Sequence, residues 1–165
     1  MAVIKKIKPN DGLNEEQREA MIGLLKTALA DQHVLYMKMR HYHWNVTGPQ
    51  FQPLHELIEE QYDDIADTID DTAERIRQYG EFAPGTLKEM LELARLTEDE
   101  TVPTAREMVA NLVADHESVI RALREDIEIA DDHDDVAVED YFTGLLQDHQ
   151  KMAWLLRAHL EGEGL

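Results

Sequence analysis

The chain has 165 residues, with 35 Asp and Glu against 16 Lys and Arg, which gives a formal net charge of −19. A chain of this length buries one ordinary hydrophobic core and is short for two typical domains. Cysteine is absent, which excludes disulfides, thiolate metal sites and thiol redox chemistry. The acidity argues against a surface that binds nucleic-acid phosphate over most of the protein, and favours either simple solubility or the attraction of cations.

The beginning of the sequence carries no targeting or membrane signal. Its first ten residues contain lysines but no apolar core segment, and no later stretch approaches the ~18 apolar residues of a membrane span. We therefore expect neither a signal peptide nor a transmembrane helix. Together with the absence of cysteine, this favours a cytoplasmic protein, either free or associated with the nucleoid.

The proline positions divide the chain into candidate helices. Proline is poorly tolerated inside helices, and the runs without it cover residues 10–48, 54–83 and 104–165. In the second run, apolar residues recur at steps of three and four, as on the buried face of a helix. The third run is too long for one helix and is interrupted by an acidic segment. Thr86 is a candidate cap for a short helix between the second and third long helices.

These segments predict an all-α fold, namely a four-helix bundle with a short extra helix in the connection between helices two and three. The sequence contains neither a strand-like alternation nor a hairpin turn motif. We expect a short tail over residues 1–13, followed by a single helical domain over residues 14–165.

Histidines gather around the predicted turn between the first two helices. The segment 47–49, Thr-Gly-Pro, should end the first helix and reverse the chain, so that His43 and His55 lie at the same end of the bundle. Glu59 follows His55 by four residues, on the same helix face. Imidazole and carboxylate together suit iron, manganese or zinc better than calcium or magnesium. The competing interpretation is that these are ordinary polar residues at helix ends.

Asp70 and Glu74 form a second candidate pair, again four residues apart. The segment 56–74 is rich in acids and has no basic residue, so an ordinary solvated surface is the competing interpretation. Asp70 lies roughly 22 Å from His55 along one helix, too far for one ion to be bound by both groups of one chain. If both groups serve one metal, two subunits must share it across a twofold interface. The Glu-x-x-His motif of metal centres inside helical bundles is absent from the sequence.

The segment HYHWNVTGPQFQPLHELIEEQYDDIADTIDDTAERIRQYG resembles the signature of the Dps mini-ferritins. The segments DQHVLYMKMRHYHW, TLKEMLELA and KMAWLLRAHL agree with it, so the similarity covers most of the chain. The resemblance implies a ferritin-like subunit that assembles into a hollow homo-dodecamer. It also implies a ferroxidase that oxidises Fe(II), with hydrogen peroxide preferred over O₂, and stores ferric mineral, which protects DNA from oxidative damage.

The resemblance also implies how the iron ligands are divided. His43, His55 and Glu59 would come from one subunit, and Asp70 and Glu74 from its partner. Members of the family mostly have Asp where this chain has Glu59, a difference that bears on metal stoichiometry and selectivity. Zinc is an alternative occupant of the same site.

Two tryptophans and the other histidines complete the candidates. Trp44 resembles the family tryptophan beside the iron centre and is a candidate electron donor. Trp154 is either its counterpart on the last helix or a core residue. His33 lies about 80° around the helix from His43 and is a candidate accessory ligand, whereas His41 should face away. We expect the remaining histidines to be surface or partly buried polar residues: His116, His133, His149 and His159.

The segment 125–140 is a second acidic stretch without Lys or Arg. It is either a solvated helix end and loop or, by the resemblance, part of an acidic threefold pore that admits cations. The candidate pore residues are Asp131, Asp135, Glu139 and Asp140.

Two rival functions stay open. The first is a DNA-compacting structural protein, because some Dps proteins bind DNA through basic tails. Here the tail offers only Lys5, Lys6 and Lys8 before an acidic body, so we expect weak or absent DNA binding. The second is a helical oligomer that binds zinc or manganese without catalysis.

Overall fold

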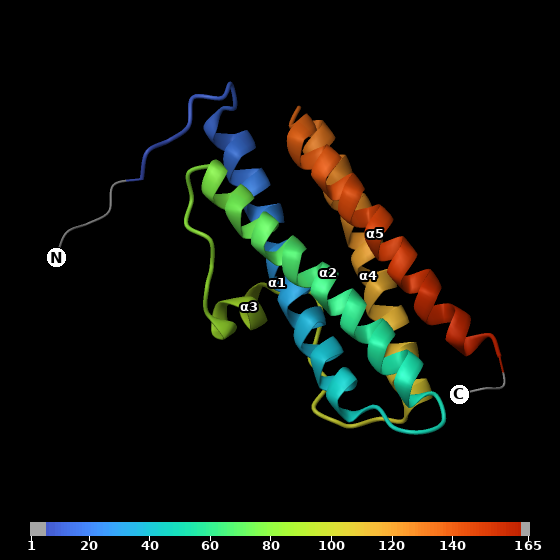
Figure 1. Ribbon diagram of the computed structural model, residues 1–165. Helices are drawn as coiled ribbons and strands as arrows, with labels where there is room; N and C mark the ends of the chain where they lie inside the picture. The colour runs from blue at the N-terminus through green and yellow to red at the C-terminus, as the bar shows by residue number, and fades with distance from the viewer. Residues whose placement is uncertain (1–5, 163–165) are drawn as a thin grey trace.

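The computed structural model describes residues 6–162, which form two helical hairpins packed side by side (Figure 1). The first hairpin consists of α1 (Glu15–Asn45) and α2 (Phe51–Gln78), and the second of α4 (Ala105–Asp132) and α5 (Val136–Leu160). The short helix α3 (Leu87–Leu93) lies in the connection between the hairpins and packs against α1. Because this connection returns along the bundle, α2 and α4 run in the same direction (Figure 1). The predicted four-helix bundle with a short extra helix is thus confirmed.

Reciprocal capping boxes begin three of these helices. In each case the cap accepts a hydrogen bond from a backbone N–H three residues later, and that later side chain accepts one from the cap backbone in return. The caps are Asn14, Thr86 and Thr104, paired with Gln17, Glu89 and Glu107. The predicted cap at Thr86 is confirmed. Helix α2 begins before Pro53, which lies in the first turn, where a missing N–H costs no helical hydrogen bond.

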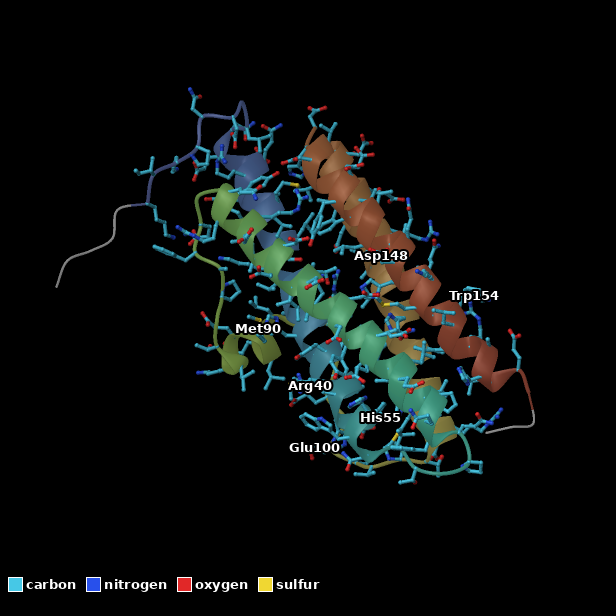
Figure 2. All side chains as sticks on the ribbon, in the orientation of Figure 1. Arg40, His55, Met90, Glu100, Asp148 and Trp154 are labelled. Carbon is cyan, nitrogen blue, oxygen red and sulfur yellow. The ribbon has the colours of Figure 1, made fainter. Side chains whose placement is uncertain are left out.

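The predicted apolar stripe of the second helix is its buried face, with Ile58, Ile65 and Ile76 in the core. By contrast, Trp154 is 58% exposed on α5, so the interpretation of this residue as a core side chain is wrong (Figure 2). Met152 takes the core position, and two residues of helical rotation turn position 154 outward. Within residues 6–162, none of the helices combines the length and the apolarity that crossing a membrane requires.

His116 on α4 and His149 on α5 are completely buried, at 0% and 2% exposure, which corrects the expectation that they are surface or partly buried residues. Their Nδ1 atoms lie 2.9 Å apart, so one neutral ring donates a hydrogen bond to the other. Burial lowers the pKa of both imidazoles, that of His149 to about 4. The sequence did contain a signal for the burial of His116. This residue follows the core residue Leu112 by four positions and precedes the core residue Val119 by three, so it lies on the same helix face.

Ion pairs between Arg95 and two buried carboxylates hold the connection between the hairpins in place. The carboxylate of Asp31 on α1 accepts hydrogen bonds from the backbone and Nε of Arg95, and from the backbone N–H of Leu96. Arg95 Nη1 also donates to Asp126 on α4, at 3.0 Å. One arginine therefore joins the connection to both hairpins, which sets the position of α4 against α1.

The segment before α1 packs against the end of α2. The buried guanidinium of Arg18 donates to Asp11 at 2.6 Å and to the carbonyl oxygen of Pro9. Gly80 has φ +83°, and a Cβ there would lie 2.8 Å from Cδ of Pro9, so only glycine fits this crossing. The predicted tail lies partly outside the described residues, and its boundary at residue 13 stays a prediction.

Candidate metal centre

The turn between α1 and α2 places the candidate ligands. Helix α1 ends at Asn45, and Gly48 adopts φ +112° in the turn, a conformation that glycine reaches without strain. The last turn of α1 and the first turn of α2 therefore lie side by side, with His55 at this end of the bundle (Figure 2). His43 faces His55 across the hairpin, as the sequence predicts.

The two imidazoles orient each other through reciprocal hydrogen bonds. His43 Nδ1 lies 2.9 Å from the carbonyl oxygen of His55, and His55 Nδ1 lies 2.8 Å from the carbonyl oxygen of His43. A carbonyl oxygen only accepts, so each Nδ1 carries the proton, and each Nε2 is the nitrogen with a free lone pair. The rings stack with centroids 3.7 Å apart and planes at 16°. Both tautomers and both ring orientations are thereby set by the backbone.

Glu59 adds a carboxylate to this pair. One ligand atom each from His43, His55 and Glu59 lies within 4.8 Å of the other two. His43 is buried, His55 is partly exposed and Glu59 is exposed, so the group opens to the surface of the subunit. Two imidazoles and one carboxylate form the donor set that protein sites use for Fe(II) while leaving coordination positions open.

Asp70 and Glu74 lie elsewhere on α2. Both are exposed, and neither carboxylate has a hydrogen-bond partner among residues 6–162. Neither belongs to the group formed by His43, His55 and Glu59, which agrees with the helical distance of roughly 22 Å. The assignment of this pair to a metal site remains a prediction.

The neighbouring histidines on α1 point to other parts of the protein. His33 donates from Nδ1 to the carbonyl oxygen of Leu29 at 2.9 Å and lines an apolar pocket of about 140 Å³ together with Met90 of α3. It lies outside the His43 group of its own chain. His41 contacts the carbonyl oxygen of Thr101 through Nε2 at 2.8 Å, so it faces away from the group, as expected.

The four candidate pore residues have different environments. Asp131 and Asp140 are exposed and Glu139 is partly exposed. Asp135 is buried, because its carboxylate caps α5 by accepting from the N–H groups of residues 137 and 138, and also accepts from Tyr79 Oη at 2.6 Å. Asp135 therefore holds α5 within the subunit, and a pore role for the four residues stays a prediction.

We call His43, His55 and Glu59 the metal group, as candidate ligands. Two residues beside this group were not identified as site residues from the sequence. Tyr62 donates a hydrogen bond to Glu59 at 3.2 Å, and its ring meets the His43 ring edge-on with centroids 5.2 Å apart. Arg40 lies over the Tyr62 ring, 5.1 Å from its centroid. Their spacing could have identified them, because residues three apart lie on the same helix face. Tyr62 follows Glu59 by three residues, and Arg40 precedes His43 by three.

The fold and the matched family define the class of this protein as ferritin-like. The sequence model of the ferritin-like domain matches residues 22–163. A low temperature-induced protein of Nostoc sp. is 45% identical over 156 residues, which cover 93% of this chain and 87% of the relative. The identity is 39% to DNA protection during starvation protein 2 of Bacillus anthracis, over 85% of this chain and 96% of the relative.

A solved structure supports the same classification. The Dps protein from Vibrio cholerae O1 superposes with a TM-score of 0.87 at 27% identity, covering 96% of this chain and 99% of the other. Its description assigns it to a broad superfamily of ferritin-like diiron-carboxylate proteins. The chain belongs to the Dps family.

Proposed function

We propose that this protein is an iron-storage and detoxification ferroxidase, which oxidises Fe(II), preferably with hydrogen peroxide, and stores the ferric product inside a homo-dodecamer. The observation that carries the proposal is the group of His43, His55 and Glu59. Two imidazoles held with free Nε2 lone pairs, next to a carboxylate at the surface, suit Fe(II) as a substrate. The resemblance to a diiron-carboxylate relative supports iron as the metal.

The site is proposed to be shared between two subunits. Three ligands of one chain leave coordination positions open, and Asp70 and Glu74 are exposed carboxylates that their own chain cannot bring to them. A twofold-related partner would supply these two carboxylates. Added carboxylate oxygen stabilises Fe(III), the harder ion, and so favours oxidation.

The reaction balances with peroxide as the oxidant. Two Fe(II) ions each give one electron to one H₂O₂ molecule, which takes up two protons and becomes two water molecules. Because both electrons arrive at the same peroxide, no hydroxyl radical is released, and nearby DNA is protected. His43 and His55 hold and orient Fe(II), and their protons stay on Nδ1, hydrogen-bonded to the backbone carbonyl oxygens, throughout.

Stopped-flow measurement of Fe(II) oxidation tests this proposal, with H₂O₂ and with O₂ in separate runs. We expect faster oxidation with H₂O₂, two Fe(II) consumed per peroxide, and loss of most of the rate in His55→Ala. The matched control is His133→Ala, which removes a histidine ring that contacts the carbonyl oxygen of Ile129 in its own helix. An unchanged rate in His55→Ala would refute the assigned site.

The same ligands also suit zinc, which has no redox chemistry, so a non-catalytic binder is the main competing function. A wild-type protein that binds Zn(II) or Mn(II) tightly but does not accelerate Fe(II) oxidation would support that alternative. DNA compaction is less well supported, because Lys6 and Lys8 lie in ion pairs with Glu81 and Glu15. A mobility-shift titration at ~50 and ~200 mM salt tests it, and we expect no binding at the higher salt.

A further inference from the structure

Tyr62 lies between two members of the metal group. Its hydroxyl donates to Glu59 Oε1 at 3.2 Å, and its ring meets the His43 ring at an interplanar angle of 86°. Only 8% of Tyr62 is exposed, whereas Glu59 is an exposed side chain. A carboxylate oxygen only accepts, so the Tyr62 hydroxyl is the donor of this hydrogen bond.

The Tyr62 ring is itself held by an aromatic cluster, formed by Tyr36, Arg40, Trp44 and Tyr62. The Arg40 guanidinium lies 5.1 Å from the ring centroids of both Trp44 and Tyr62, and 5.5 Å from that of Tyr36. It also donates to Tyr36 Oη at 2.6 Å. The Tyr36 ring meets the Tyr62 ring edge-on at 5.9 Å. Tyr62 is therefore fixed by Arg40, Tyr36 and His43 together.

Glu59 needs such an anchor more than a shorter aspartate would. Glutamate has one more rotatable bond, and an exposed glutamate samples many rotamers in water. Tyr62 Oη is the hydrogen-bond partner of this carboxylate within residues 6–162. Outer partners of this kind commonly change metal affinity by ~10- to 100-fold when they are removed.

We propose that Tyr62 is a positioning residue that orients the Glu59 carboxylate toward His43 and His55, with Arg40 holding Tyr62 in place. The hydrogen bond engages Oε1 and leaves Oε2 as the oxygen with no competing donor. The bond thus selects one carboxylate orientation before the metal arrives, which reduces the entropy cost of binding. This inference rests on the proposed function, because it assigns Tyr62 to the same iron site.

The test uses Co(II), an air-stable divalent ion, titrated into the full-length protein and followed by its visible absorption. The key variant is Tyr62→Phe, which keeps the ring and removes only the hydroxyl. We expect the Kd for Co(II) to rise by about tenfold and the absorption bands to change, because the carboxylate changes its orientation. The matched control is Tyr79→Phe, which removes a phenol hydroxyl that bonds Asp135 and lies outside both the aromatic cluster and the metal group. This control should keep the wild-type Kd and spectrum.

A double-mutant cycle separates positioning from a general structural effect. In a Glu59→Asp background the carboxylate is too short to reach Tyr62 Oη, so Tyr62→Phe should have no further effect on the Kd. Arg40→Gln loosens Tyr62 without touching the metal group, and should weaken Co(II) binding when Tyr62 is present but not in Tyr62→Phe. Because Arg40→Gln leaves the phenol in place, it tests the proposal even if Tyr62→Phe folds poorly.

The outcomes distinguish this proposal from the proposed function. If His55→Ala abolishes Co(II) binding but Tyr62→Phe keeps the wild-type Kd and spectrum, the positioning role is refuted and the iron site stands. Equal effects of Tyr62→Phe in the wild-type and Glu59→Asp backgrounds also refute it. If Co(II) binding is unaffected by His55→Ala, both the site and the role of Tyr62 are wrong.

Discussion

Mixing two inactive variants distinguishes a shared site from one within a single chain. In His55→Ala, every subunit lacks an imidazole of the first half-site, and in Asp70→Ala every subunit lacks a carboxylate of the second. The helical distance between these residues is roughly 22 Å, so the two lesions fall in different halves of a shared site. In a twofold pair with one subunit of each kind, one site receives both lesions and the other receives neither.

The expected recovery follows from this geometry. Random assembly of equal amounts places one subunit of each kind in about half of the twofold pairs, so about one quarter of all sites become intact. Subunits are dissociated, mixed and reassembled, and the initial rate of Fe(II) oxidation by H₂O₂ is measured by stopped flow. The mixture should show about one quarter of the wild-type rate, while each variant reassembled alone stays inactive.

Asp71→Ala is the matched control, because Asp71 is the exposed acidic neighbour of Asp70 on α2. This variant alone should oxidise Fe(II) at close to the wild-type rate. If the reassembled mixture of His55→Ala and Asp70→Ala is no faster than the two variants alone, the sites are not shared and the division of ligands is wrong.

Three further predictions concern the fold that carries the site. The buried pair of His116 and His149 should make the protein less stable in acid, because burial lowers the pKa of both imidazoles, that of His149 from 6.5 to about 4. The contribution of His149 to the free energy of unfolding is therefore fully present above pH 6.5, and about 3 kcal/mol of it is lost as the pH falls to about 4. Denaturant unfolding of His149→Gln should show a weaker dependence of the free energy of unfolding on pH over this range. Arg95→Met leaves the buried Asp31 carboxylate without its cation and should lower the free energy of unfolding by about 3 kcal/mol, with unchanged stability counting against the buried ion pair. Asp135→Ala removes the cap of α5 and should cost about 1 kcal/mol or more in the same measurement, and a smaller loss would mean that the cap is dispensable.

Several features of the candidate metal centre were predictable because they depend on local sequence. The turn after α1 and the spacing of Glu59 after His55 place the three candidate ligands at one end of a hairpin, whatever the rest of the bundle does. The role of Tyr62 was not predictable in this way. The position of Tyr62 on the apolar stripe of α2 predicts that it is buried, but an ordinary core residue would show the same pattern. Its contact with the His43 ring depends on how α1 packs against α2.

The amino-acid sequence by itself determined the helices, their order, the apolar faces and the candidate ligand types, because periodicity and turn residues act over a few neighbouring positions. Tertiary structure alone decided which polar side chains meet: the reciprocal bonds of His43 and His55, the buried pair of His116 and His149, and the bond from Tyr79 to Asp135. The physical reason is that a helix defines its faces relative to its own axis. Contacts between helices depend on their crossing, their rotation and the rotamers that the packed core allows.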